Sequence, residues 1–180
     1  MCIRDSIIGT IVTMNPDPNN DFNPEKIMIV SYDRDFLQLQ KYKFVRQYSP
    51  LLKKELVEKN PRLYLQTHII KGDKGDGVPN IFSDDNVFVE GFRQTPVSQK
   101  KIDTIIEDLE EGEFLYAASW YRNYCRNKKL IDLTETPEDL RKEIINSFIR
   151  QDVWNNKFKT FNYLVNKRCN NLIESVQEFI

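Results

Sequence analysis

The feature that most constrains the fold is a short apolar run that ends in two acids. Residues 26–32 (KIMIVSY) are rich in Ile and Val, and Asp33-Arg34-Asp35 follows them directly. A run of this length and composition is typical of a strand buried in a parallel sheet. In open α/β sheets, ligands bind at the carboxyl end of such strands. The run therefore predicts an α/β fold with a polar site that begins at Asp33.

The rest of the chain carries mostly helical patterns. Ile and Val residues between Ile7 and Val12 have helical spacing, and residues 15–24 are a loop rich in proline and asparagine. A short helix begins at Phe36, and residues 44–48 form a second strand. Further helices are predicted over 61–71, near 87–90, and over 98–110, 113–126, 137–150 and 154–166. Because one or two strands do not make a stable sheet, we expect part of the sheet to be missing from the amino-terminal side of this chain.

Composition narrows the class of protein and of partner. With 40% hydrophobic residues the chain can bury a core, and no apolar run approaches the roughly 18–20 residues of a membrane helix. The 26 basic residues nearly balance 27 acidic ones, so a nucleic-acid site needs local clustering of charge. The three cysteines are scattered and the chain has 1 histidine, which argues against zinc and for reduced thiols in a cytosol-like compartment.

Asp33 and Asp35 are the first candidate site residues. Residues i and i+2 of an extended chain point to the same side, so their carboxylates should converge. Two acids this close repel each other unless a cation lies between them, and carboxylate oxygen is the ligand that Mg²⁺ and Mn²⁺ prefer. The alternative interpretation is a solvated turn in which Asp35 caps the following helix.

A glycine-rich segment, residues 71–80 (KGDKGDGVPN), is the second candidate. Glycines allow close approach of another backbone, and free N–H groups at the start of a following helix can bind phosphate. Lys71 and Lys74 add positive charge, whereas Asp73 and Asp76 suit a metal or a hydrogen-bonded turn. The ligand spacing of a calcium loop and the Gly-Lys-Ser/Thr of a P-loop are both missing. The alternative is a tight loop with Asx turns.

Together the two segments predict metal-assisted cleavage of a phosphodiester. Two cations about 4 Å apart could clamp the attacking and leaving oxygens, while the loop holds a nucleic-acid strand by its phosphates. His68 has apolar neighbours and no partner histidine or cysteine, so we expect a structural role for it.

Residues 30–39 (VSYDRDFLQL), followed by 69–80 (IIKGDKGDGVPN), resemble the flap endonuclease and 5′-3′ exonuclease family, above all its phage ribonuclease H branch of the T-even type. The likeness extends over roughly residues 26 to 150. It implies a PIN-like, mainly parallel sheet and a helix–hairpin–helix motif at about 61–91. Residues 1–48 would be the remnant of the catalytic α/β nuclease domain, and residues 49–180 the helical carboxyl-terminal region.

The resemblance implies a nuclease that removes nucleotides, flaps or RNA primers from 5′ ends during replication. The catalytic residues that it implies are Asp33, Asp35 and Asp76. Its metal ligands, around two Mg²⁺ or Mn²⁺ ions, are Asp33, Asp35, Asp73, Asp76 and Asp5. Its DNA-binding residues are Lys71, Gly72, Lys74, Gly75, Gly77 and Val78. Whether the hairpin also holds a monovalent cation is left open.

The same resemblance implies the partners. They are DNA and RNA–DNA duplexes with a 5′ end or flap, together with replication proteins such as a single-strand-binding protein or a clamp. No membrane partner is expected. A monomer in the cytoplasm of the host cell is expected for a phage-encoded protein.

The chain departs from the family at its start. The family has a Glu-Ala-Asp-Asp run before a helix, where this chain has Ile3-Arg4-Asp5-Ser6, so one carboxylate of the run is kept. We expect residues 1–6 to be foreign sequence joined to the carboxyl-terminal part of a longer enzyme, and the isolated chain to be inactive. Two alternatives are a non-catalytic duplex-binding module and a metal-independent structural helper of replication.

Overall fold

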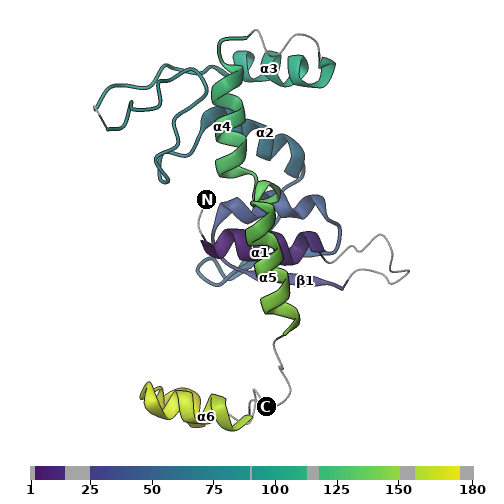
Figure 1. Ribbon diagram of the computed structural model, residues 1–180, viewed down its shortest axis with the longest axis vertical. Helices are drawn as coiled ribbons and strands as arrows, with labels where there is room; N and C mark the ends of the chain where they lie inside the picture. The colour runs from purple at the N-terminus through teal and green to yellow at the C-terminus, as the bar shows by residue number, and fades with distance from the viewer. Residues whose placement is uncertain (1–2, 15–24, 90, 113–117, 151–156, 175–180) are drawn as a thin grey trace. The chain divides into compact units, whose positions relative to one another are not determined.

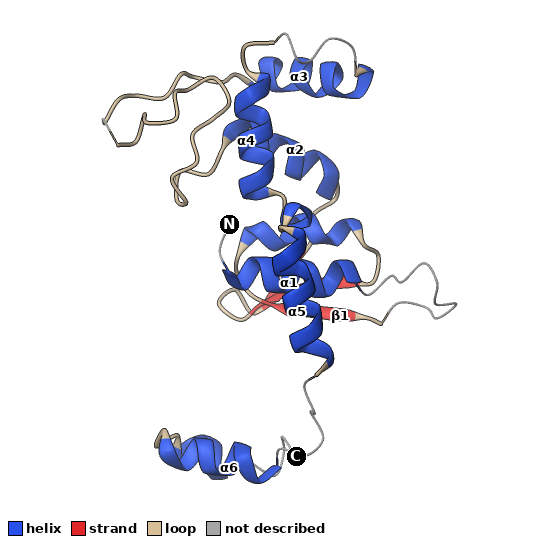
Figure 2. Ribbon diagram, viewed as in Figure 1, coloured by secondary structure: helices blue, strands red, loops and turns tan. Residues whose placement is uncertain are grey.

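Helices dominate the secondary structure, and one small sheet accompanies them (Figures 1 and 2). The computed structural model describes residues 3–14, 25–89, 91–112, 118–150 and 157–174. Contacts divide the chain into two units, Met1–Ile145 and Asn146–Ile180. The described helices are α1 (Ile3–Met14), α2 (Pro61–Lys71), α3 (Gln99–Glu111), α4 (Tyr121–Ile131), α5 (Glu138–Ile149), α6 (Lys157–Asn166) and α7 (Asn170–Glu174), with 3₁₀ helices η1 (Arg34–Lys41) and η3 (Leu133–Glu135).

The sheet has the strand order β1-β2-β3, with β1 at Ile27–Val30, β2 at Val45–Ser49 and β3 at Lys54–Leu56. Strand β1 pairs parallel with β2, and β2 pairs antiparallel with β3. The two predicted strands and the parallel pairing are thus confirmed, but β3 was not predicted. The prediction of a buried β1 is wrong: Ile29 is 6% exposed whereas Val30 is 63% exposed, because β1 is an edge strand and alternate side chains face away from the core.

The first hydrophobic core lies between α1, η1 and the sheet, which confirms the helix predicted from the Ile and Val spacing. Its buried members are Val12, Ile29, Phe36, Leu39, Val45 and Leu133. A second cluster joins α2, the glycine-rich hairpin and α4 through Leu65, Ile69, Val78 and Ile131. The hairpin is therefore attached to α2 and α4, and α2 in turn packs against η1 beside the sheet.

Two buried amide side chains connect distant segments. Gln38 Nε2 donates to the Ile131 carbonyl at 3.0 Å, and Gln38 Oε1 accepts from the Leu133 amide at 3.0 Å. Asn127 Nδ2 donates to the carbonyls of Ile69, at 2.9 Å, and Pro79, at 2.8 Å. Since a buried backbone group without a partner costs about 1–3 kcal/mol, these bonds fix η1 and the hairpin against α4.

Several helix boundaries follow the predicted signals. Asn60 caps α2 by accepting from the Leu63 amide, Gly72 ends it, and Ser98 caps α3. The helix predicted near 87–90 is wrong, because residues 85–89 form turns; residue 90 is outside the described part. The helix predicted over 113–126 is described only from 118 and begins at Tyr121. The predicted loop at 15–24 and the start of the helix predicted at 154 also lie outside the described residues.

Candidate metal centre

Five acids from three segments line one open cleft of about 520 Å³ in the unit Met1–Ile145. One comes from α1, two from the junction of β1 and η1, and two from the hairpin after α2. They are Asp5, Asp33, Asp35, Asp73 and Asp76. All the carboxylates that the sequence singled out as metal ligands are brought together, although metal binding itself stays a prediction.

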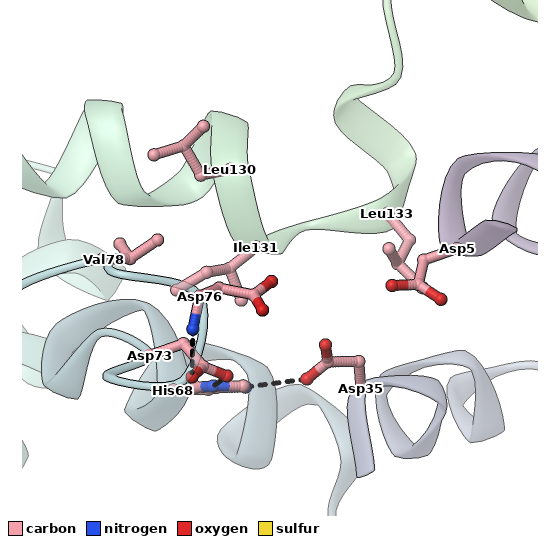
Figure 3. Close-up of a pocket in the computed structure, with 9 residues that line it drawn as sticks. All are labelled: Asp5, Asp35, His68, Asp73, Asp76, Val78, Leu130, Ile131 and Leu133. Carbon is pink, nitrogen blue, oxygen red and sulfur yellow. Dashed lines mark hydrogen bonds and ion pairs between the residues drawn. The ribbon is translucent and has the colours of Figure 1, made fainter. Parts of the chain in front are cut away.

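A smaller cavity within this region has an acidic side and an apolar side (Figure 3). Its volume of about 10 Å³ has space for roughly one water molecule or a bare cation. Asp35 and Asp5 approach it from η1 and α1, and Ile131 and Leu133 form part of its apolar wall. An apolar wall lowers the local dielectric and therefore strengthens the interaction between the carboxylates and any cation.

Asp33 is held at the beginning of η1 by its backbone and by one of its carboxylate oxygens. Its Oδ1 accepts from the Asp35 amide at 3.1 Å, and its own amide donates to Ser31 Oγ at 3.1 Å. Its carbonyl accepts from Gln47 Nε2 at 2.6 Å. The alternative interpretation of a helix cap is thus correct in part, but the capping residue is Asp33 and not Asp35. Asp35 keeps its carboxylate directed into the cleft.

Arg4 occupies the space between the acids of α1 and η1. Its Nη2 lies 2.7 Å from Asp5 Oδ1 and 2.5 Å from Asp33 Oδ2. Hydrogen bonds to Asp5 and then Asp33 raise the pKa of the guanidinium above its ordinary value. The ligand oxygens of Asp5, Asp33 and Asp35 lie within 4.8 Å of one another, a spacing that one cation could share. Arg4 supplies positive charge at the place where such a cation would bind.

Replacing Arg4 with alanine is therefore expected to raise the affinity of the cleft for Mg²⁺. The expected gain is about fivefold, equivalent to the roughly 1 kcal/mol that a partly exposed ion pair contributes. Isothermal titration calorimetry at low ionic strength measures it. Arg34→Ala is the matched control, because Arg34 lines the same cleft and its side chain forms no ion pair with the described residues. An equal gain in both variants would contradict competition by Arg4.

Asp35 has the most perturbed carboxylate of the cleft. Burial raises its pKa to about 6, His68 acts to lower it, and the charges of Asp33, Asp73 and Asp5 raise it further. A carboxylate that resists ionisation among other acids is typical of a functional site. A divalent cation beside Asp35 would relieve this repulsion.

The raised pKa of Asp35 predicts a pH dependence of stability in the absence of divalent cations. Because the folded-state pKa of about 6 exceeds the ordinary 3.8, protonated Asp35 favours the fold. This contribution is fully present below about pH 4 and is lost as the pH rises through about 6, with a total of at most about 3 kcal/mol. Urea unfolding of the wild type and Asp35→Asn in a chelator, from pH 4 to 8, measures it. A difference between the two proteins that stays constant over this range would contradict the assignment.

Asp73, the first acid of the hairpin after α2, makes the hydrogen bonds that hold the hairpin together. Asp73 and Val78 form an isolated β-bridge, and the Val78 amide donates to the Asp73 carbonyl at 2.7 Å. Asp73 Oδ1 accepts from the amides of Gly75, at 2.7 Å, and Asp76, at 3.2 Å. The predicted Asx turns are therefore present. The expectation of free N–H groups at a helix start is wrong here, because Asp73 takes two of them and the next helix begins only at Gln99.

The remaining predicted DNA-binding residues differ in what they can contact. Lys71, Lys74 and Gly77 are exposed beside the cleft. Gly72 ends α2 with a φ of +68° and donates its amide to the His68 carbonyl. The side chain of Val78 is buried in the cluster with α2 and α4, so it anchors the hairpin and cannot itself reach DNA.

His68 is one of the cleft residues whose place was not predicted. Its Nε2 lies 3.2 Å from Asp73 Oδ2, and its Nδ1 lies 3.8 Å from Asp35 Oδ1. The side chain thus stands between the acids of the two separate segments (Figure 3). One signal could have found it: His68 lies in the last turn of α2, four residues before Gly72, and so on the helix end that enters the hairpin.

Comparisons with known proteins show which proteins this chain is similar to. The family model described as "T4 RNase H, C terminal" matches residues 60–179. Ribonuclease H of Enterobacteria phage T4 is 31% identical over 159 residues, which cover 86% of this chain and 52% of the relative. The chain therefore spans about half the length of the curated relative that it matches.

Proposed function

Because the chain belongs to the T4-type ribonuclease H branch of the flap endonuclease and 5′-3′ exonuclease family, we propose that it carries part of a metal-dependent nuclease centre. The reaction is hydrolysis of phosphodiesters at 5′ ends, at flaps or in RNA primers. The substrates are DNA and RNA–DNA duplexes, and the place of action is the cytoplasm of a phage-infected cell. The single observation that supports this most strongly is the convergence of five acids on one cleft.

The donor groups of the cleft fit divalent cations. Carboxylate oxygens are hard ligands, and Asp35 belongs to both groups of side chains whose ligand atoms lie within 4.8 Å of one another. One group adds Asp5 and Asp33, and the other adds His68 and Asp73. This sharing supports a two-ion centre with Asp35 between the ions. Ions bound there would polarise the phosphodiester and activate water.

The residues around this centre have distinct tasks in the proposed reaction. Asp33 is positioned by its cap bonds, and Asp35 supplies the carboxylate common to both groups. The side chain of Asp76 is exposed at the cleft and makes no hydrogen bond or ion pair with other described residues, so it is available to orient an ion or its water. Lys71 and Lys74 are free to neutralise substrate phosphates.

We also propose the finer architecture that the family implies. Residues 1–48 belong to the PIN-like catalytic part. The helix–hairpin–helix motif, expected at about 61–91, begins with α2 and the hairpin, but its second helix is α3, because residues 85–89 form turns and the next described helix begins at Gln99. The long turn region between hairpin and α3 supports this, because it is tied to α4: Arg122 Nη2 lies 2.7 Å from Asp85 Oδ2, and Asn123 Nδ2 donates to the Ile81 carbonyl at 3.0 Å.

The experiment is cleavage of a 5′-flap DNA and of an RNA–DNA duplex with and without Mg²⁺. It is run with this chain and with any longer gene product that contains it. The proposal expects Mg²⁺-dependent release of 5′ products by the longer gene product, which Asp33→Asn reduces strongly, and little or no cleavage by the isolated chain. Duplex binding without cleavage, unchanged in Asp33→Asn, would replace the proposal with the second candidate, a non-catalytic binding module.

A further inference from the structure

We propose that His68 binds one of the two divalent ions directly, through Nδ1, and that Asp73 holds the imidazole in place for this. The inference rests on the proposed function, and it deepens that function by assigning a nitrogen ligand to a centre otherwise made of carboxylates. The position nearest the hairpin, between Asp35 and His68, is where this ion would lie.

The first support is the environment of Nδ1. This atom is buried and has no hydrogen-bond partner among the residues that the structure describes. It lies 3.8 Å from Asp35 Oδ1, which is too long for a hydrogen bond. Two ligands of one octahedral ion are about 3.0 Å apart when adjacent and about 4.2 Å apart when opposite, for ligand distances near 2.1 Å. The observed 3.8 Å lies between these two values, so one ion can reach both atoms, and a shift of less than about 1 Å brings them to an octahedral spacing.

The second support is the state of the other ring nitrogen. Nε2 lies 3.2 Å from Asp73 Oδ2, and Asp73 Oδ1 is already bound to the amides of Gly75 and Asp76. A carboxylate fixed in this way accepts the Nε2 proton, which leaves a lone pair on Nδ1. The ring of Tyr64 packs edge-on against His68, with 5.8 Å between centroids, and limits its rotation. The carboxylate–imidazole–cation order is a common metal-site arrangement.

This arrangement changes the role of Asp73. The family resemblance makes it a metal ligand, whereas its two oxygens here accept from the hairpin amides and from His68. Asp73 is then a positioning residue, and its effect on the ion passes through the imidazole. Asp73→Asn should weaken Mn²⁺ binding by about tenfold or more, as loss of such a partner usually does.

A nitrogen ligand also sets the preference between cations. Mg²⁺ strongly favours oxygen, while Mn²⁺ stands above it in affinity for mixed nitrogen and oxygen sites. His68→Gln should therefore lower the affinity for Mn²⁺ about tenfold and leave that for Mg²⁺ almost unchanged.

The decisive experiment is pulsed electron paramagnetic resonance of the full chain loaded with Mn²⁺. A directly bound imidazole nitrogen produces ¹⁴N modulation of the Mn²⁺ echo. Because the chain has 1 histidine, the signal has a single possible source among histidines. Protein grown with ¹⁵N-histidine needs no substitution and must shift the modulation to the ¹⁵N frequency. His68→Gln must remove it, and Asp35→Asn must abolish Mn²⁺ binding at this position.

The outcomes separate this inference from the proposed function. Mn²⁺ bound at Asp35 without nitrogen modulation would overturn the role of His68 and leave a carboxylate nuclease centre standing. Nitrogen modulation in this chain, together with no cleavage by a longer gene product that contains it, would support the ligand assignment and count against the nuclease. If no Mn²⁺ bound in the cleft, both would be overturned.

Discussion

Replacing Asp35 with asparagine is expected to lower Mg²⁺-dependent cleavage by about 10³-fold or more, and at the same time to stabilise the metal-free protein. Asp35 is common to both groups of candidate ligands, so its loss weakens both ion positions. An ion-binding carboxylate of this kind contributes several kcal/mol to transition-state stabilisation. The metal-free variant is expected to be more stable than the wild type because burial and neighbouring acids disfavour the charged form of Asp35, which asparagine lacks. Flap-cleavage rates and urea unfolding in a chelator at pH 7.5 measure the two effects.

The control for Asp35 is Asp108→Asn. Asp108 is exposed on α3 and outside the cleft, so this variant makes the same chemical change without touching the acids. It should keep the wild-type rate and stability within about 0.5 kcal/mol. If Asp35→Asn cleaved normally, or if it lost stability in the chelator, the assignment of a repulsive carboxylate cluster would be wrong.

Replacing Gly72 with alanine is expected to destabilise the protein by at least about 3 kcal/mol and to abolish substrate binding by the hairpin. Gly72 has a φ of +68°, and an added Cβ would lie 2.4 Å from the Val78 carbonyl oxygen and 2.6 Å from the Pro79 carbonyl. These are backbone atoms, which cannot rotate away as a flexible side chain can. The hairpin must therefore open, and His68 and Asp73 at its base move with it. Thermal unfolding and duplex-binding assays measure the loss.

Gly112 offers a control for the positive φ of Gly72, because it ends α3 with a φ of +72° and no described atom lies within 4 Å of its added Cβ. The two residues differ in ψ, which is 1° at Gly112 and −179° at Gly72. Gly112→Ala should cost about 1 kcal/mol, which is the cost of a positive φ for alanine, because the added Cβ meets no other described atom. A similar loss in both variants would show that conformational strain alone explains the effect. The close approach between Gly72 and the far side of the hairpin would then have no energetic role.

Helices and strands could be predicted where the residues of one segment alone determine its secondary structure and its ends. The Ile and Val run predicted β1, Pro61 and Gly72 predicted the two ends of α2, and Ser98 predicted the start of α3. The cap at Asn60 was not predicted. Strand β3 could not be found in this way, because Lys54-Glu55-Leu56 has no apolar alternation and pairs only because β2 lies beside it. Ser83-Asp84-Asp85 are residue types typical of a helix N-cap, and they suggested a helix near residues 87–90. In the structure, residues 85–89 form turns instead.

The candidate site could be predicted as a set of acids but not as a set of contacts. Spacing and residue type pointed to Asp33, Asp35, Asp73 and Asp76, and the family resemblance added Asp5. The structure brings all five carboxylates into one cleft. The position of Arg4 between Asp5 and Asp33 depends on how α1 packs against η1, which no local pattern encodes. His68 was judged by its lack of histidine and cysteine partners, although its neighbours in space are carboxylates of two other segments.

The hydrogen bonds of Gln38 bear on when the cleft can form during translation. Chain synthesis proceeds from the amino terminus, so η1 leaves the ribosome long before its partners at Ile131 and Leu133. A nascent polypeptide that ends before residue 131 lacks both partners of Gln38 and the η3 turn against which α1 packs. The acids then have no fixed spacing. Binding of divalent cations should therefore appear abruptly with growing chain length. A ribosome-bound chain should bind no cation in the cleft until the segment with Ile131 and Leu133 has left the ribosome.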